Sequence, residues 1–140
     1  MSNRKENLTI VVGCGTLGAR VANEIYHTGA NVIVIDRTAD SFRRLESSFG
    51  GQTIVGDSCD FEVLKRADIE KATTVIAVTN FENNNIFVGQ AAKALFHVEN
   101  VMVRVLHKDK ESLCTNMGIS TICPAQLSAD EVIELYRGRY

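Results

Sequence analysis

Short, continuously apolar segments alternate along the chain with longer amphipathic ones. The apolar segments are rich in Val, Ile and Thr, as expected of strands that are buried on both faces of a sheet. They cover residues 8–13, 31–36, 52–57, 73–79, 101–106 and 119–123. The segments between them place apolar side chains every three or four residues, which predicts helices. These helices cover residues 17–28, 39–49, 60–67, 82–96, 108–117 and 128–137.

Two of the predicted helices carry end signals. Gly29 directly follows the first helix, and glycine readily adopts the left-handed conformation that ends many helices. The last helix follows Pro124, the single proline of the chain, and Ser128 is placed to cap its N-terminus.

A strand followed by a helix, repeated six times, predicts parallel strands joined by right-handed crossovers. The predicted fold class is α/β, a Rossmann-like doubly wound parallel sheet of six strands in the order 3-2-1-4-5-6, with a further helix at the C-terminal end. No linker rich in Gly, Ser or Pro divides residues 1–140, so we expect a single domain. No residues remain for a separate substrate domain.

Composition and charge limit the binding partners and the cellular location that we expect. The chain has 140 residues, of which 45% are apolar and 23% charged, and its net charge is −2. Because the charges are mixed along the chain, general nucleic-acid binding is not expected. No apolar run reaches the roughly 18 residues that span a bilayer, and the first residues lack the apolar core of a secretion signal. We therefore expect a cytosolic protein.

The cysteines and histidines do not indicate a metal site. Cys14, Cys59, Cys114 and Cys123 are dispersed without a C-x-x-C pair, as are the three histidines. Metal sites need clustered ligands, and cytosolic thiols are mostly reduced. We expect four free cysteines.

A glycine-rich loop, VVGCGTLGARV at residues 11–21, follows the first predicted strand. Gly13, Gly15 and Gly18 have the spacing G-x-G-x-x-G between a strand and a helix. In that context the first glycine permits a tight turn, the second lets the backbone approach a pyrophosphate, and the third lets helix and strand pack closely. The helix N-terminus also favours an anion. The loop predicts a nucleotide cradle, and the alternative is a tight corner without a ligand.

An acidic residue ends the second predicted strand. Asp36 lies eighteen residues beyond Gly18, where a carboxylate can accept both ribose hydroxyl hydrogens of an adenosine. A 2′-phosphate would meet this carboxylate as like charge, which favours NAD over NADP, although the adjacent Arg37 would tolerate the phosphate. The alternative for Asp36 is a solvated acid at a strand end.

Four further segments together resemble RCK domains, the regulators of potassium conductance. The segment TIVGDSCDFEVLKRADIEKATTVIAVT at 53–79 resembles the family segment in which a Gly-Asp pair ends the third strand. TNFENNN at 79–85 resembles the Thr-x-x-Asp-x-x-Asn run, and VMVRV at 101–105 has the arginine of the fifth strand. NMGISTICP at 116–124 resembles the Leu-Gly-(Val/Ile)…Pro ending. The resemblance covers nearly the whole chain.

The resemblance implies a nucleotide site at the carboxyl ends of the strands. The three glycines would contact phosphates and Asp36 the ribose. Asp57 and Ser58 would lie beside the adenine, with Cys59 as a neighbouring wall. The expected binding residues are, in full, Gly13, Cys14, Gly15, Thr16, Leu17, Gly18, Asp36, Arg37, Asp57, Ser58, Cys59, Thr79, Asn80 and Arg104. No catalytic residue and no metal ligand are expected.

On the far side of the site, the resemblance implies that Thr79 and Asn80 face the pyrophosphate or the second ribose. Arg104 would pair with a phosphate. The alternatives are turn chemistry for Thr79 and Asn80, and a surface ion pair for Arg104.

Two positions depart from the family pattern. Many members have arginine after the second glycine, where it reaches a terminal phosphate, whereas this chain has Thr16. The lost charge favours NAD(H), with ATP, ADP or AMP as alternatives. Glu82 stands where the family has aspartate and keeps the negative charge.

The function implied by the resemblance is a cytoplasmic regulatory subunit, not an enzyme. Nucleotide binding would rearrange a dimer or an octameric ring and so gate an integral membrane potassium-translocating subunit of Trk/Ktr type, at the inner face of the membrane. Family members commonly carry a further ligand-sensing domain. We expect it to be absent from residues 1–140. The chain is then either a fragment or a natural single-domain subunit, for which a companion subunit would supply that domain.

The last predicted helix has apolar positions that suit crossing to a neighbouring subunit, and packing on its own domain is the alternative. These positions are Val132, Ile133, Leu135 and Tyr136.

The alternative function of another class is the nucleotide-binding domain of an NAD-dependent oxidoreductase. Such an enzyme needs a proton-transfer group near the nicotinamide, and the chain has no Tyr-x-x-x-Lys motif and no suitably placed His-Asp pair. A third hypothesis is a nucleotide-binding fragment of a larger enzyme. The GDS and TNFENNN segments favour the regulator over both.

Overall fold

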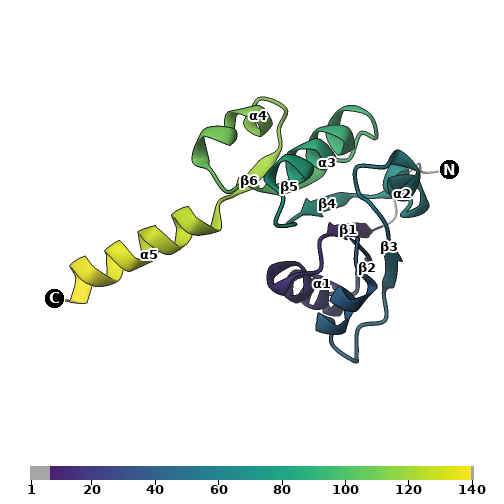
Figure 1. Ribbon diagram of the computed structural model, residues 1–140, viewed down its shortest axis with the longest axis horizontal. Coiled ribbons are helices and arrows are strands. Elements are labelled where there is room, and N and C mark those ends of the chain that lie inside the picture. The colour runs from purple at the N-terminus through teal and green to yellow at the C-terminus, as the bar shows by residue number, and fades with distance from the viewer. Residues whose placement is uncertain (1–6, 140) are drawn as a thin grey trace.

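Six parallel strands form one sheet in the computed structural model, which describes residues 7–139 (Figure 1). They are β1 (Leu8–Val12), β2 (Asn31–Asp36), β3 (Gln52–Val55), β4 (Thr74–Ala77), β5 (Asn100–Arg104) and β6 (Ser120–Ile122). Their order is β3-β2-β1-β4-β5-β6, which confirms the predicted doubly wound topology. β1 lies between β2 and β4, and all five of its residues are buried.

Helices cover both faces of the sheet. The helices that flank the sheet are α1 (Thr16–His27), α2 (Phe61–Arg66), α3 (Glu82–Ala94) and α4 (Ser112–Thr115). The chain also forms α5 (Pro124–Arg139) and the 3-10 turns η1 (Ala39–Arg44), η2 (Ile69–Lys71) and η3 (Lys108–Lys110). Because side chains alternate along a strand, Val11 packs in the cluster beneath α1, whereas Ile10 and Val12 pack in the cluster beneath α2 and α3. The sheet is therefore buried on both faces.

The helix predicted over 39–49 is wrong in its second half. Only η1 is helical, and the backbone turns extended at Leu45. The Asn23 side-chain oxygen accepts the Glu46 N–H at 3.1 Å, which removes that donor from a helical ladder. The apolar side chains of the segment still pack against the α1 side of the core, so the periodicity located the buried face and not the backbone conformation.

The other helix boundaries differ by less. The last helix begins at Pro124 and not after Ser128, because proline suits a first turn in which no N–H donor is needed. The predicted helix 108–117 is divided between η3 and α4. Gly29 follows α1 with a φ of +96°, as its position predicted.

α5 projects away from the sheet (Figure 1). Several of its apolar side chains are exposed, among them Leu127, Val132, Ile133, Leu135 and Tyr136. Packing of this helix on its own domain, the alternative considered from sequence, is not what the structure shows. Within residues 7–139, no helix combines the length and the apolar character needed to cross a membrane.

Candidate functional site

A cavity of about 690 Å³ lies where the strands end at their carboxyl termini. Parallel α/β sheets bind ligands at this edge, where the strand order reverses on either side of β1. Ten of the residues predicted from sequence line it: Gly13, Gly15, Thr16, Leu17, Asp36, Arg37, Ser58, Thr79, Asn80 and Arg104. The fold thus brings together segments that are far apart in the chain.

The three glycines of the loop between β1 and α1 have different roles. Gly13 has a φ of +101°, and a Cβ there would lie 2.9 Å from the backbone nitrogen of Thr79. At Gly18 a Cβ would lie 1.8 Å from the carbonyl oxygen of Gly13, so only glycine lets α1 pack against the loop. A Cβ at Gly15 would meet no atom within 4 Å. The backbone is therefore bare where it faces the cavity.

The N-terminus of α1 is open to the same cavity. Gly15 is its N-cap residue, and no side chain caps the helix. Thr16 and Leu17, the first helical residues, line the cavity. The first N–H groups of a helix have no partner within the helix and favour an anion. This end of the cavity is suited to a phosphate.

The Asp36 carboxylate joins the end of β2 to the glycine loop. Its Oδ2 accepts the Cys14 N–H at 2.8 Å, and its Oδ1 accepts the Thr38 N–H at 2.9 Å. These two bonds set the orientation of the carboxylate at the cavity wall. A carboxylate has about four acceptor positions, so each oxygen can still accept a hydroxyl hydrogen.

Arg37, which lines the cavity, contacts an acid and lies near an aromatic ring. Its Nη2 lies 3.4 Å from Asp57 Oδ2, and its guanidinium carbon lies 6.0 Å from the centre of the Phe81 ring. Asp57 Oδ1 accepts the N–H of Cys59 at 2.9 Å. Both oxygens of Asp57 are thus engaged, one by the Cys59 N–H and the other by the Arg37 guanidinium group.

Four of the residues expected to bind do not line the cavity, namely Cys14, Gly18, Asp57 and Cys59. The Cys14 side chain lies in the core beneath α1 and contributes only its N–H, to Asp36. Burial, and then the charge of Asp36, raises the pKa of the Cys14 thiol to about 11. Burial also raises the pKa of Cys59. These thiols are poor nucleophiles at neutral pH.

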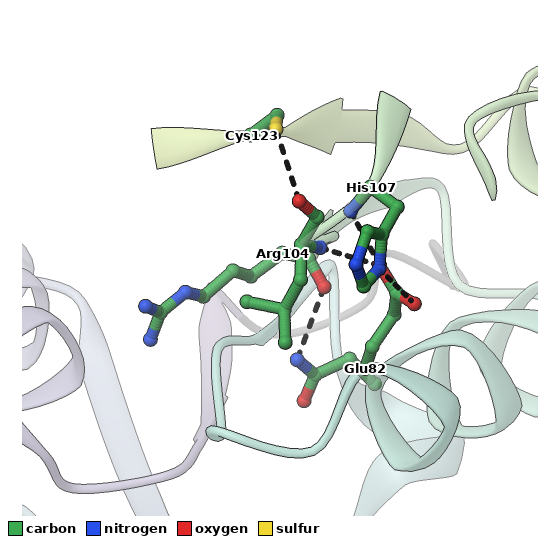
Figure 2. A network of polar contacts seen from close by, with 6 residues as sticks. Glu82, Arg104, His107 and Cys123 are labelled. Atoms are coloured by element: carbon green, nitrogen blue, oxygen red, sulfur yellow. Dashed lines mark hydrogen bonds and ion pairs between the residues drawn. The ribbon is translucent and has the colours of Figure 1, made fainter. Parts of the chain in front are cut away.

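A polar network joins the ends of β4 and β5 through the first turn of α3, and Figure 2 shows the part of it around Arg104, Glu82 and His107. The Thr79 hydroxyl bonds to Asn85 Oδ1 at 2.6 Å and accepts the Phe81 N–H at 3.1 Å. The alternative of turn chemistry therefore describes this hydroxyl. Asn80 Oδ1 accepts from Arg104 Nη1 at 3.3 Å, so Asn80 contacts the arginine across the cavity.

Arg104 makes no ion pair with any residue of the described chain, which argues against the surface ion pair considered from sequence. Its Nε is buried without a hydrogen-bond partner. Buried polar groups are almost always paired, so this nitrogen is an exception among the described side chains.

Glu82 holds the turn that follows β5. Its carboxylate accepts the N–H groups of Leu106 and His107, the latter at 2.8 Å, and lies 3.3 Å from His107 Nδ1. Burial raises the pKa of Glu82, but the hydrogen bonds from His107 and Leu106 outweigh it, so the pKa is lowered overall. The carboxylate is thus stabilised in its charged form.

Sequence reasoning missed two arginines that also line the cavity, Arg20 and Arg44. Arg20 lies four residues after Thr16, on the same helix face, and that spacing could have identified it. Arg44 ends η1, and no sequence pattern indicated that this segment reaches the cavity. With Arg37 and Arg104, the described residues that line the cavity include four arginines and one acid, Asp36. Arg20 also pairs with Glu24, and Arg37 with Asp57, each at 3.4 Å. The lining is positive and attracts anions.

The model of the TrkA-N domain family matches residues 9–124. The Trk system potassium uptake protein TrkA of Streptomyces coelicolor is 36% identical over 124 residues, which are 89% of this chain and 56% of the relative. The TrkA of Vibrio alginolyticus is 27% identical over 69% of this chain and 21% of the relative. The chain therefore spans about half of the first relative and a fifth of the second.

Solved structures share the fold. The TrkA-N domain of the inner membrane protein YbaL of Escherichia coli superposes with a TM-score of 0.80, at 19% identity, over 92% of this chain and 96% of that one. The GsuK channel bound to ADP has a TM-score of 0.80, at 21% identity, over 99% and 36%. GsuK bound to NAD has a TM-score of 0.69, at 14% identity, over 89% and 22%.

Proposed function

The chain belongs to the TrkA-N domain family, and on that premise we propose that it is a regulatory nucleotide-binding domain of a potassium transport system. One observation carries the proposal. The uncapped N-terminus of α1 and the four arginines meet in a single cavity with Asp36, whose carboxylate is oriented to accept hydroxyl hydrogens. A phosphate would bind to the helix N-terminus and the arginines, and a ribose beside it would donate to Asp36.

The proposed ligand is an adenosine nucleotide, NAD(H) first, with ATP, ADP or AMP as alternatives. Its ribose hydroxyls donate to Asp36, and its phosphates lie against Gly15 and the first N–H groups of α1. The adenine lies toward Ser58, and the Arg104 guanidinium group donates hydrogen bonds to a phosphate. The ADP and NAD bound to GsuK, which shares the fold, support this class of ligand.

Regulation fits the cavity better than catalysis does. Among the described residues, those lining it include no His, Cys, Tyr or Lys. The oxidoreductase alternative needs such a group to transfer a proton near a nicotinamide. The relatives named as potassium uptake proteins support the regulator.

A thermal-shift panel tests the proposal. NAD, NADH, ATP, ADP, AMP and NADP are each titrated against the protein. A ligand at 100 times its Kd stabilises the folded state by about 2.7 kcal/mol, which raises Tm by several degrees. At least one of the first five should do so, and NADP less than NAD. A flat response to all six refutes nucleotide binding.

We further propose that α5 joins two copies of the chain, in a dimer or within a larger ring, and that the assembly acts on an integral membrane potassium-translocating subunit from the cytoplasmic side. The exposed apolar side chains of α5 support self-association, since burying them between subunits removes them from water. Nucleotide binding would shift the equilibrium between two arrangements of the assembly.

Light scattering tests the role of α5. Val132, which is 62% exposed, is replaced in Val132→Glu, and the adjacent exposed position in the control Glu131→Gln. The wild type and the control should form dimers or larger species, and Val132→Glu should be a monomer. A wild-type monomer at high concentration would contradict self-association by this chain.

A further inference from the structure

Asn85, in the first turn of α3, uses all the hydrogen-bonding capacity of its side chain. It is 1% exposed. Its Nδ2 donates to the carbonyl oxygens of Thr79, at 2.9 Å, and Arg104, at 3.1 Å. Its Oδ1 accepts the Thr79 N–H at 2.9 Å and the Thr79 hydroxyl at 2.6 Å. Two donors and two acceptor positions are the full inventory of a primary amide.

These bonds lie where the sheet itself stops holding β4 and β5 together. The parallel register pairs Ala77 with Val103 and is not continued beyond that pair. Arg104 directly follows Val103, and Thr79 lies two residues after Ala77. The amide of Asn85 takes the place of the missing ladder bonds, so it sets the separation of the two backbones at the edge of the cavity.

Glu82, three residues earlier in the same turn of α3, fixes the backbone that follows Arg104. It accepts the N–H groups of Leu106 and His107. The first turn of α3 therefore holds the chain both at residue 104 and at residues 106–107. Figure 2 shows the Arg104 side chain pointing away from this network, and it reaches the cavity and Asn80.

We propose that Asn85 and Glu82 are positioning residues that aim Arg104 at a phosphate of the bound nucleotide. Arg104 lines the cavity and donates from Nη1 to Asn80, so the end of its guanidinium group is what this arrangement presents to a ligand. Thr79 belongs to the same network, and its hydroxyl is engaged there rather than with ligand. The inference rests on the proposed function, in which Arg104 contacts phosphate. It adds a role for the run from Thr79 to Asn85.

A double-mutant cycle separates positioning from a general structural role. The variants are Asn85→Asp, which keeps the shape and removes both donors, Arg104→Ala, Asp36→Ala and the corresponding pairs. Asn83→Asp is the matched control, because Asn83 is exposed in the same turn. Titration calorimetry with ADP and with NAD gives Kd for each protein.

Arg104→Ala should weaken ADP binding about tenfold or more, as expected for a lost charged hydrogen bond. Asn85→Asp should weaken it several-fold, and Asn83→Asp should not. Adding Asn85→Asp to Arg104→Ala should bring little further loss, because the group that Asn85 positions is already gone. Added to Asp36→Ala, the same change should multiply the losses, because the two sites act independently.

The failures can be told apart. Losses that multiply in both pairs show that Asn85 acts through general stability, which overturns the inference and leaves the proposed function. Normal ADP binding by Arg104→Ala overturns the inference in the same way. If the wild type binds none of NAD, NADH, ATP, ADP, AMP and NADP, the proposed function is refuted, and the inference with it. Should Asn85→Asp not fold, Glu82→Gln takes its place in the cycle, with the same expected outcomes.

Discussion

Gly15 and Gly18 lie three residues apart in the glycine-rich loop. From the structure we expect alanine at Gly18 to lower the stability of the fold, and alanine at Gly15 to weaken nucleotide binding. At Gly18 the added Cβ would lie 1.8 Å from the Gly13 carbonyl oxygen, more than an ångström inside the closest real contacts. Backbone atoms cannot swing aside, so α1 must move off the loop. Overpacking of this kind costs about 1–3 kcal/mol. Gly18→Ala should therefore lower Tm by roughly 2–4 °C per kcal/mol lost.

Gly15→Ala should leave the fold intact. The added Cβ meets no atom within 4 Å, and the φ of −80° suits any residue. Alanine is a poorer N-cap residue than glycine, but it also reduces the entropy of the unfolded chain by about 0.4–1 kcal/mol. The two effects oppose each other, so the free energy of unfolding should change by less than about 1 kcal/mol.

Nucleotide binding should separate the two variants in the reverse order. The Cβ of Gly15→Ala would occupy the space where the proposed phosphate approaches the backbone. Its affinity for ADP should therefore fall at least tenfold, about 1.4 kcal/mol. Urea unfolding measures stability, and calorimetry with ADP measures binding. Wild-type ADP affinity in a stable Gly15→Ala protein would refute the placement of the phosphate. An unchanged Tm in Gly18→Ala would refute the packing of α1 on the loop.

Three further outcomes follow from the same contacts. Asp36→Ala should weaken the binding of every adenosine ligand at least tenfold, since it removes a charged acceptor for the ribose. Calorimetry with NAD and ADP checks this, and equal Kd values for the variant and the wild type would place the ribose elsewhere. Because the pKa of Glu82 is lowered in the folded state, its contribution to stability is present above about pH 4.3 and is lost as pH falls through the folded pKa. Urea unfolding from pH 7 to pH 3 should show a smaller decline for Glu82→Gln than for the wild type, and parallel curves would contradict the linkage. At pH 8 a thiol reagent should label Cys59 first and leave Cys14 unmodified, because Cys14 is fully buried and its pKa is raised to about 11. Mass spectrometry of the labelled peptides identifies the site, and Cys59→Ser is the control.

The sequence predicted the topology well because a parallel sheet buried on both faces leaves strong local signals. Its strands are short apolar runs, and the crossover rule restricts their order. The glycine spacing and Asp36 could be recognised equally well from the sequence, because each belongs to one strand end. The end of the helical segment after residue 44 could not be predicted from the sequence. It depends on the Asn23 side chain, which reaches Glu46 from another element.

Side chains at the far end of the cavity were harder to assign from sequence. Arg104 could be expected near a ligand, but its unpartnered Nε is visible only once its surroundings are known. Thr79 was expected to face the ligand, yet its hydroxyl bonds to Asn85. Both outcomes depend on how α3 meets two strands.

Local chemistry in the chain, then, determined the six strands, their order, the glycine loop and the acid beside it. Periodicity and turn chemistry act over a few residues, and a sequence displays them directly. Tertiary structure alone decided which polar groups are satisfied within the protein and which remain for a ligand. Asn85 and Arg104 are nineteen residues apart, and Asn80 and Arg104 twenty-four. Contacts at such separations are set by the packing of α3 on β4 and β5, so the partners of Arg104 emerge only when the chain is folded.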